Sequence, residues 1–248
     1  MKVVVIGGTG LIGSQVVEKL RKLGHEAVPA APSTGVNTLT GEGLADVLKG
    51  ASVVVDVSNS PSFAPDAVME FFRTSTTNLL SAEAAAGVSH HVALSVVGTE
   101  RLEKNGYFRA KLAQEELIKA SGVAYSIVHA TQFFEFVKAI ADSMTEGDTV
   151  RAPAAKIQPI YSGDVAEAVA RAAVGSPLDG MVEIAGPDAF DFKEFLDTGL
   201  APGNDTRTVV SDPHGQYFGS ELEERDLLPG PDAQIAATRF TDWLAQQQ

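Results

Sequence analysis

The 248-residue chain contains no cysteine. This absence excludes a disulfide framework, a cysteine-ligated zinc or iron–sulfur site, and a thiol nucleophile. Positive charge is also scarce, because 19 Lys and Arg stand against 32 Asp and Glu and leave a formal net charge of −13. Binding to nucleic acid or to an anionic membrane requires clustered Lys and Arg. The composition therefore argues against both as the main partner.

Long apolar runs and histidine clusters are missing as well. The longest apolar stretches are far shorter than the roughly 18 to 20 residues that a membrane-spanning helix requires. The five histidines show no metal-ligand spacing, so we expect no metal site. The sequence opens directly on a strand pattern, without the charged and apolar leader of a secretory signal. Together these absences predict a soluble cytoplasmic protein.

What is present is an alternation of strand and helix patterns. Strands are predicted at residues 2–6, 26–30, 52–57, 91–96, 124–129 and 181–185. Helices are predicted at residues 11–23, 43–49, 66–86, 107–120, 133–145, 164–174 and 238–246. Repeated strand–helix units require a parallel sheet with right-handed crossovers and helices on both faces. We therefore predict an α/β fold, a Rossmann-type doubly wound parallel sheet.

The regular pattern loosens from about Gly147 onward. Residues 202–231 are rich in Pro, Gly and Asp and have weak periodicity. Neither an internal repeat nor a low-complexity linker divides the sequence. We therefore predict a single domain over residues 1–248, in which residues 147–248 contribute most of a small C-terminal substrate-binding elaboration.

A glycine-rich turn joins the first predicted strand to the first predicted helix. Gly7, Gly10 and Gly13 form a G-x-x-G-x-x-G array there. A turn without Cβ atoms lets the backbone approach a pyrophosphate, and the helix N-terminus supplies free N–H donors and a positive dipole. Strand, glycines, helix and second strand follow within about 30 residues, which favours a dinucleotide site over a plain turn. The predicted cofactor contacts are Gly7, Thr9, Gly10, Leu11, Ile12 and Gly13.

The end of the second strand is where NAD and NADP are distinguished. An acidic residue there binds the ribose 2′-hydroxyl of NAD, whereas a basic residue accommodates the 2′-phosphate of NADP. Residues 28–34 read Val-Pro-Ala-Ala-Pro-Ser-Thr and contain neither. Because no acid repels a phosphate and Ser33 can hydrogen-bond to one, we favour NADP(H) over NAD(H). At the end of the next strand, Ser58, Asn59 and Ser60 are further predicted cofactor contacts.

Tyr107 and Lys111 place a phenol and an ammonium four residues apart, on one face of a predicted helix. A phenol has a reference pKa near 10, so a neighbouring cation must stabilise its anion before it can act as an acid–base group. Lys111 can do this while it binds ribose hydroxyls, and Ser95 can donate a hydrogen bond to a substrate carbonyl. Spacing alone favours a plainer interpretation, a tyrosine at a helix start and a solvated lysine. Glu115 and Glu116 are likewise interpreted as a solvated helix face.

Several motifs together carry a family resemblance. They are the glycine turn, Leu94-Ser95-Val96-Val97-Gly98, Tyr107–Lys111 running into Leu117, Val123–Phe134, Ser162–Ala166 and Ile184–Pro187. In these motifs the chain resembles the short-chain dehydrogenase/reductase superfamily, specifically its atypical NmrA-like NAD(P)H-binding branch. The resemblance covers most of the chain and implies a Rossmann core with a small C-terminal substrate-binding part. It also implies that Ser95, Tyr107 and Lys111 are the catalytic residues.

The resemblance further implies which residues lie beside the nicotinamide. These are Ala130 and Thr131 as cofactor contacts, and Gln132, Phe133 and Phe134 as substrate contacts. An apolar pocket would be walled by Phe133, Phe134, Phe136, Tyr217 and Phe218. For Phe136, a core position on an apolar helix stripe is an equally good interpretation.

Two positions depart from the family pattern. Phe72 stands where related extended enzymes carry an Asn of the proton relay, and His129 stands where the branch usually carries Arg. A single histidine at a strand end is more often a packed structural residue than a catalytic one. The branch also contains non-catalytic NAD(P)-binding redox sensors that act through a protein partner, and many of them lack the tyrosine.

The presence of Tyr107 favours an enzyme. We predict an NAD(P)H-dependent oxidoreductase, a monomer or homodimer, that transfers hydride to a carbonyl or similar unsaturated group of a small organic substrate. The first alternative is the non-catalytic redox sensor. A nucleotide-sugar epimerase of the extended branch is a third interpretation, which the missing Asn and the short chain disfavour.

Overall fold

The structure, a computed structural model, describes residues 1–203 and 205–247 and contains two compact units. Unit 1 comprises residues 1–96, 106–129 and 165–182. Unit 2 comprises residues 97–105, 130–164 and the chain from Glu183 onward. Each unit therefore draws on segments that are far apart in the sequence, and unit 2 includes residues well before Gly147.

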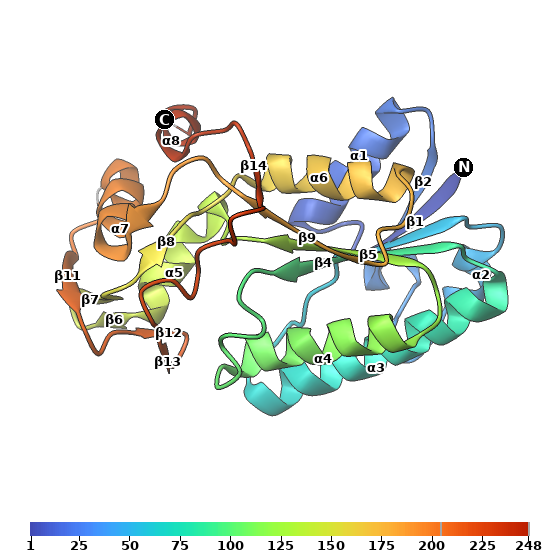
Figure 1. The fold of residues 1–248 in the computed structure, drawn as a ribbon, viewed down its shortest axis with the longest axis horizontal. Coiled ribbons are helices and arrows are strands. Elements are labelled where there is room, and N and C mark those ends of the chain that lie inside the picture. Colours follow the sequence, from blue (N-terminus) through green and yellow to red (C-terminus); the bar gives the residue numbers. More distant parts are fainter. Residues whose placement is uncertain (204, 248) are drawn as a thin grey trace. The chain divides into compact units, whose positions relative to one another are not determined.

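A seven-stranded sheet with the strand order β14-β9-β5-β4-β3-β1-β2 forms the core of the fold (Figure 1). The strands that lie wholly or largely in unit 1 are β1 (Lys2–Ile6), β2 (Glu26–Ala30), β3 (Val53–Asp56), β4 (His90–Val96), β5 (Tyr125–Ala130) and the first half of β9 (Gly180–Ala185). β1 pairs in parallel with β2 and with β3, and β3 pairs in parallel with β4. Val3, Val4 and Val5 are fully buried, as expected of a parallel strand covered on both faces.

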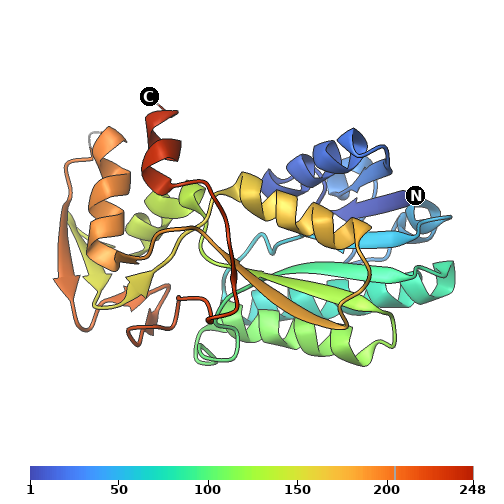
Figure 2. The ribbon, with the colours of Figure 1, turned by 45° about the horizontal axis from the view of Figure 1, so that its top comes forward.

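Helices cover both faces of this sheet, which confirms the predicted Rossmann-type architecture (Figures 1 and 2). On one face lie α3 (Pro65–Ala86) and α4 (Gly106–Ala120), and on the other α1 (Leu11–Lys22) and α6 (Ser162–Val174). Each of the four agrees with its predicted range to within two residues. The short α2 (Leu44–Leu48) contributes two buried leucines to the core beside β1 and β3.

Unit 2 consists of short strands and helices around an aromatic core. Its strands are β6 (Thr145–Glu146), β7 (Thr149–Pro153), β8 (Lys156–Ile157), the end of β9, β10 (Phe190–Asp191), β11 (Thr208–Asp212), β12 (Gln216–Tyr217), β13 (Ser220–Glu221) and β14 (Gln234–Ile235). Its helices are α5 (Val137–Ser143), α7 (Phe192–Leu200) and α8 (Phe240–Ala245), with 3-10 turns at Phe134–Phe136 and Ala201–Gly203. The ring centroid of Phe240 lies 4.9 Å from that of Phe195 and 5.0 Å from that of Phe134.

Two elements of unit 2 differ from the sequence prediction. The helix predicted over residues 133–145 is a 3-10 turn followed by α5, and it ends early because Thr145 pairs with Val150 across a turn at Gly147. Helix α7 was not predicted, although its buried residues show helical spacing. These buried residues are Phe192, Phe195, Leu196 and Leu200.

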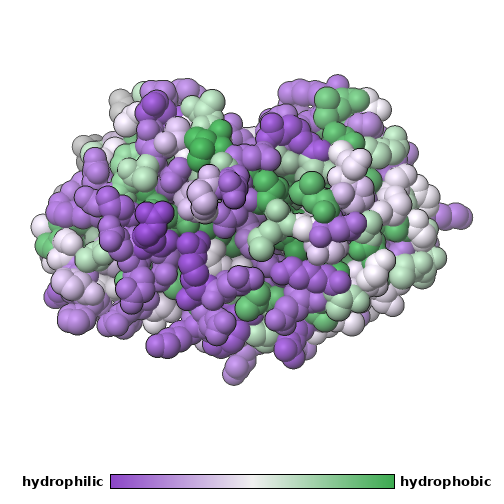
Figure 3. Space-filling view, viewed as in Figure 1, coloured by the Kyte–Doolittle hydropathy of each residue, from purple (hydrophilic) through white to green (hydrophobic). Residues whose placement is uncertain are grey.

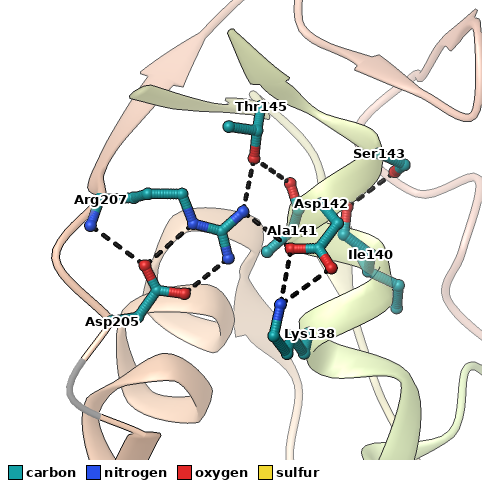
Figure 4. Close-up of polar contacts among 8 residues, drawn as sticks. All are labelled: Lys138, Ile140, Ala141, Asp142, Ser143, Thr145, Asp205 and Arg207. Atoms are coloured by element: carbon teal, nitrogen blue, oxygen red, sulfur yellow. Dashed lines mark hydrogen bonds and ion pairs between the residues drawn. The ribbon is translucent and has the colours of Figure 1, made fainter. Parts of the chain in front are cut away.

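Arg207, the residue just before β11, forms hydrogen bonds with residues at the end of α5 and just after it (Figure 4). Its guanidinium donates hydrogen bonds to both carboxylate oxygens of Asp205, at 2.9 and 2.6 Å. It also donates to Asp142 Oδ1 at 2.8 Å and to Thr145 Oγ1 at 2.7 Å. Hydrogen bonds with Arg207 lower the pKa of Asp205 to about 2. The network joins two segments that are more than 60 residues apart in the sequence.

Hydrophilic residues cover most of the face seen in Figure 3, with hydrophobic residues in smaller groups between them. Such a mixture is usual, because apolar atoms contribute much of any folded protein's surface. Within residues 1–203 and 205–247, no helix has both the length and the apolar character needed to cross a membrane.

Candidate functional site

The turn between β1 and α1 is a backbone cradle in which some positions admit only glycine. Gly7 adopts a φ of 75°, and a Cβ there would lie 2.9 Å from the Ser58 backbone. A Cβ on Gly13 would lie 2.2 Å from the carbonyl oxygen of Gly7. At Gly10 the nearest atom would be 3.3 Å away, which is tight but admits a small adjustment. Gly7 and Gly13 are therefore required by the chain's own packing, whereas Gly10 leaves an open side at the helix start.

Helix α1 begins at this turn with no side chain capping it. Gly10 is the N-cap residue, and the first helical turn contains no acidic residue. Thr9, Gly10 and Leu11 are exposed, while Ile12 and Gly13 are buried beneath them. Uncapped N–H groups at the positive end of a helix dipole attract an anion. This arrangement suits a phosphate group that approaches the backbone.

A short 3-10 turn, Pro32–Thr34, follows β2 and contains the hydroxyls expected near the adenosine ribose. Thr34 Oγ1 accepts a hydrogen bond from the Ala31 N–H at 2.9 Å and donates one to the Ala31 carbonyl, also at 2.9 Å. Thr34 therefore stabilises the turn itself. Ser33 is exposed at the same strand end.

Asp56, at the end of β3, organises the loop that follows it. Its Oδ1 accepts hydrogen bonds from the N–H of Ser58 at 3.0 Å and from the Ser58 hydroxyl at 2.6 Å. Further along the loop, Asn59 Oδ1 accepts from the Ser60 N–H at 2.9 Å, and the Ser60 hydroxyl donates to the Ser62 carbonyl at 2.7 Å. The predicted contacts Ser58, Asn59 and Ser60 thus lie in a loop whose conformation is stabilised by hydrogen bonds of their own side chains.

Tyr107, in the first turn of α4, lies among aromatic rings. Its ring centroid is 5.7 Å from that of Phe63, 6.0 Å from that of Phe72 and 6.1 Å from that of Phe108. Burial raises the pKa of Tyr107 to about 12. The phenol therefore keeps its proton at neutral pH, which is the state required of a group that donates a proton.

Lys111, one turn further along α4, is directed into unit 1. Its side-chain nitrogen Nζ donates hydrogen bonds to the Leu94 carbonyl at 2.9 Å and to Gln114 Oε1. The same nitrogen lies 4.4 Å from the centroid of the Phe72 ring, in cation–π geometry. Lys111 is only 3% exposed, and burial lowers its pKa to about 8. The ring of Phe72 therefore contacts the ammonium of this lysine.

The hydrogen bonds of Lys111 continue through Gln114 to the loop after β3. Gln114 Nε2 donates to Asp56 Oδ2 at 3.0 Å, and the other carboxylate oxygen of Asp56 accepts a hydrogen bond from the Ser58 N–H. Gln114 and Asp56 are 1% and 2% exposed. A buried chain of contacts therefore connects the predicted catalytic lysine to a predicted cofactor-binding loop within unit 1.

Ser95, at the end of β4, donates a hydrogen bond to Glu115 Oε1 at 2.6 Å. His129 Nε2, from β5, lies 2.9 Å from the same oxygen. The interpretation of Glu115 as part of a solvated helix face is wrong, because the residue is 1% exposed, whereas Glu116 is exposed as expected. The helix turns Glu115 toward the β4 and β5 strand ends, and Glu116 lies about 100° further around the helix. Burial acts against the ionised carboxylate, but the contacts with His129 and Ser95 hold the pKa of Glu115 below its usual value.

The residues expected beside the nicotinamide begin with the last residue of β5 and belong to unit 2. Ala130, Thr131 and Gln132 are buried. The Thr131 N–H donates to the Ile184 carbonyl at 3.1 Å, and the Gln132 carbonyl accepts from the Ile160 N–H at 2.8 Å. Within the described residues, Thr131 Oγ1 and both amide atoms of Gln132 are buried without a hydrogen-bond partner. Buried polar atoms are rarely left unpaired, so these atoms mark a position suited to a ligand or water.

The aromatic residues expected to wall a pocket have different environments. Phe134 is 1% exposed and belongs to the core of unit 2. Phe133 and Phe136 are stacked with centroids 5.5 Å apart, and Phe136 is exposed. Tyr217 is buried against Phe218, which is 48% exposed. Exposed aromatic surface is therefore present at Phe136 and Phe218, whereas Phe134 has a packing role.

Unit 2 also contains a cavity of about 530 Å³ near the start of α7, and no predicted site residue lines it. Both of its lining lysines already pair with lining aspartates, Lys156 with Asp191 at 3.6 Å and Lys193 with Asp197. Over the part of the chain that the structure describes, no group of three or more His, Asp and Glu is placed to hold a metal ion.

Residues 7–174 match the family described as NAD(P)H-binding. This segment contains the glycine turn, Ser95, Tyr107 and Lys111, and it spans well over half of the chain. The chain belongs to the NAD(P)H-binding family. Its relatives of known name include both a reductase and an assembly factor.

The reductase is (4-alkanoyl-5-oxo-2,5-dihydrofuran-3-yl)methyl phosphate reductase of Streptomyces griseus subsp. griseus, 26% identical over 211 residues, 77% of this chain and 70% of the relative. The assembly factor is photosystem II assembly factor Ycf39 of Cyanophora paradoxa, 26% identical over 149 residues, 54% of this chain and 46% of the relative. Among solved structures, MoeE5 in complex with UDP-glucose and NAD has a TM-score of 0.75 at 20% identity, over 100% of this chain and 97% of that one. This structural likeness shows the shared fold.

In this NAD(P)H-binding protein, the residues present fit a dinucleotide. The glycine cradle excludes side chains of its own, and the first turn of α1 is uncapped and free of acidic residues. Both features are what a pyrophosphate requires. In unit 2, the unpaired polar atoms of Thr131 and Gln132 are of the kind that hydrogen-bond a carboxamide or a ribose.

Sequence reasoning missed three buried polar residues of the candidate site, Asp56, Gln114 and Glu115. One signal was available, because Tyr107, Lys111 and Glu115 follow one another at intervals of four and share one helix face. If that face is turned toward the sheet, Glu115 is buried with it. Asp56 offered a weaker signal, as an acidic residue at the carboxyl end of an apolar strand.

Proposed function

We propose that this protein is an NAD(P)H-dependent oxidoreductase of the short-chain dehydrogenase/reductase type. In this proposal it transfers hydride to a carbonyl or similar unsaturated group of a small organic substrate. The observation that carries the proposal is the phenol of Tyr107, which lies one helical turn before the buried Lys111 on α4 and in the same unit as the glycine cradle. A reductase needs such a group, because the reduced oxygen must receive a proton.

The roles of the residues follow from their chemistry. When bound, the dinucleotide supplies the hydride. The open side of the turn at Gly10 admits its pyrophosphate to the backbone at the start of α1, and Gly7 and Gly13 let the turn pack tightly. Tyr107 gives its proton to the substrate oxygen, so that one hydride and one proton together reduce the carbonyl to an alcohol. Ser95 orients the reacting groups.

Lys111 is the electrostatic partner of the phenolate that Tyr107 leaves behind. Because its pKa is about 8, the ammonium is mostly charged at neutral pH. Its hydrogen bonds to the Leu94 carbonyl and to Gln114 fix its position. In the proposal it also contacts the cofactor ribose.

Other features of the proposal concern the ligands. We expect Thr131 and Ala130 to contact the cofactor, and Gln132 and Phe133 to contact the substrate, whereas the buried Phe134 packs in the core of unit 2. NADP(H) is preferred over NAD(H), since an exposed hydroxyl and no carboxylate stand at the end of β2. We further expect a monomer or homodimer in the cytoplasm.

The reductase relative supports an enzyme and guides the choice of substrates. Its name describes an oxo-dihydrofuran ring that bears an alkanoyl group and a methyl phosphate group. The assembly-factor relative supports a second candidate, a non-catalytic NAD(P)-binding regulator that acts through a protein partner. The two candidates differ in whether NAD(P)H is consumed.

The test follows the absorbance of NADPH or NADH with a panel of quinones, aldehydes, ketones and unsaturated lactones. We expect wild type to oxidise the cofactor with at least one compound. Tyr107→Phe should lower kcat by roughly 10²- to 10⁴-fold, the range typical of a lost general acid. Its cofactor affinity should stay within about 2-fold of wild type.

Tyr125→Phe, the same substitution at the start of β5, is the matched control and should retain wild-type turnover. Full activity of Tyr107→Phe would contradict the role of the phenol. Tight cofactor binding without turnover of any compound would contradict the enzyme and favour the regulator.

A further inference from the structure

Ser95 has a single proton, and the structure shows where it goes. A serine hydroxyl carries one O–H donor and two acceptor lone pairs. The Ser95 hydroxyl lies 2.6 Å from Glu115 Oε1, the short distance of a hydrogen bond to a charged acceptor. An ionised carboxylate can only accept. The Ser95 hydroxyl therefore donates its hydrogen bond to Glu115, and only the lone pairs of the Ser95 oxygen remain for other partners.

Glu115 is held in the ionised form by its surroundings. It is 1% exposed, and a buried carboxylate is stable only when cations or donors surround it. His129 Nε2 lies 2.9 Å from Oε1, and Lys119 Nζ lies 3.8 Å from Oε2. The interactions with His129 and Ser95 and the charge of the nearby Lys111 outweigh burial and lower the pKa of Glu115.

We propose that Glu115, supported by His129, is a positioning residue that makes Ser95 a hydrogen-bond acceptor toward the reacting groups. The inference rests on the proposed function, because it takes Ser95 to face those groups. It reverses the polarity expected from the sequence, where Ser95 donates to a substrate carbonyl. Ser95 instead accepts a hydrogen bond from a hydroxyl, such as that of the alcohol product, because the single proton of the Tyr107 phenol goes to the substrate oxygen. It also gives His129 a role at a position where the family usually carries Arg.

A double-mutant cycle tests whether Glu115 acts through Ser95. The variants are Glu115→Gln, Ser95→Ala and the double variant, assayed with NADPH and the panel compound that wild type reduces fastest. Glu115→Gln should lower kcat roughly 10-fold or more and leave the dissociation constant of NADPH within about 2-fold of wild type. In the Ser95→Ala background, the same substitution should change kcat by less than about 2-fold.

The matched control is Glu116→Gln, an identical change at the exposed neighbouring residue. It should behave like wild type. Independent, multiplicative losses from Glu115→Gln and Ser95→Ala would overturn the inference. So would a Glu115→Gln enzyme that is as active as Glu116→Gln.

A second measurement does not depend on turnover. The carboxyl of Glu115 is titrated by ¹³C NMR in wild type, in Ser95→Ala and in Ser89→Ala, where Ser89 is an exposed serine just before β4. Ser95→Ala should raise the pKa of Glu115, because a hydrogen bond to the ionised form is lost, and Ser89→Ala should leave it unchanged. An unchanged pKa in Ser95→Ala would overturn the inference. If wild type reduces no panel compound, the proposed function fails, and this titration alone decides whether Glu115 binds the Ser95 proton.

Discussion

At the scale of single residues, the proposed preference for NADP(H) depends on Ser33. This residue is exposed beside a turn that Thr34 stabilises, and no carboxylate follows β2 to repel a phosphate. We predict that Ser33→Ala weakens NADP⁺ binding by roughly 5- to 10-fold, the effect of one lost hydrogen bond. NAD⁺ lacks the phosphate, so its affinity should not change. Titration of both cofactors against both proteins measures this, and equal NADP⁺ affinities would rule out a role for Ser33.

At the scale of elements, the turn between β1 and α1 contains two kinds of glycine, one required by packing and one that faces the open side of the turn. A Cβ on Gly13 would lie 2.2 Å from the Gly7 carbonyl oxygen, so Gly13→Ala should lower the free energy of unfolding by about 1–3 kcal/mol, as overpacking does. Gly10 has a φ of −82°, which alanine adopts readily, and a Cβ added there would lie 3.3 Å from its nearest atom. Gly10→Ala should therefore stay within about 1 kcal/mol of wild type. It should nevertheless bind the dinucleotide less tightly, because a methyl group would occupy the open side of the turn.

Urea unfolding measures the stability of both variants, and cofactor titration measures their binding. Equal destabilisation by the two substitutions would contradict the distinction between packing and ligand glycines. Unchanged cofactor affinity of Gly10→Ala would place the pyrophosphate elsewhere.

At the scale of the whole molecule, two adjacent histidines of β4 make opposite contributions to the pH dependence of stability. Burial and the neighbouring His91 lower the pKa of His90 in the folded state below 6.5, so its contribution to stability is lost as the pH falls. His91 is fully buried 2.8 Å from Glu83, and although burial opposes charge, the Glu83 carboxylate raises its pKa above 6.5. Its contribution is therefore present below pH 6.5 and lost as the pH rises through the raised value.

The contributions of His90 and His91 to stability add together. The difference in stability between a Glu83 variant and wild type therefore isolates the contribution of the His91–Glu83 pair. We predict that Glu83→Gln is less stable than wild type at about pH 6, and that this gap narrows toward about pH 9. Glu70→Gln, the same change at an exposed position of the same helix, should show no such trend. Urea unfolding at several pH values measures the gap. A gap that is constant or widens with pH would contradict the assignment of a charged His91.

The elements of unit 1 could be predicted because their signals are local. A buried parallel strand is a continuous apolar run, and an amphipathic helix repeats every three or four residues. The short strands of unit 2 carry no such signal. β8 and β10 have two residues each and are strands only because they pair with each other. Helix α7 does carry a helical repeat, in Phe192, Phe195 and Leu196, and could have been predicted.

The sequence by itself determined the glycine turn and the spacing of Tyr107 and Lys111, because both depend on neighbours along the chain. Only the tertiary structure decided where the side chains of α4 point. Lys111 donates to Leu94, 17 residues away, and Glu115 meets Ser95 and His129 from two separate strands. Whether a charged residue on a helix is solvated or buried depends on which element packs against that face. A local pattern does not contain that information, so the pattern alone places Glu115 on the surface although the fold buries it.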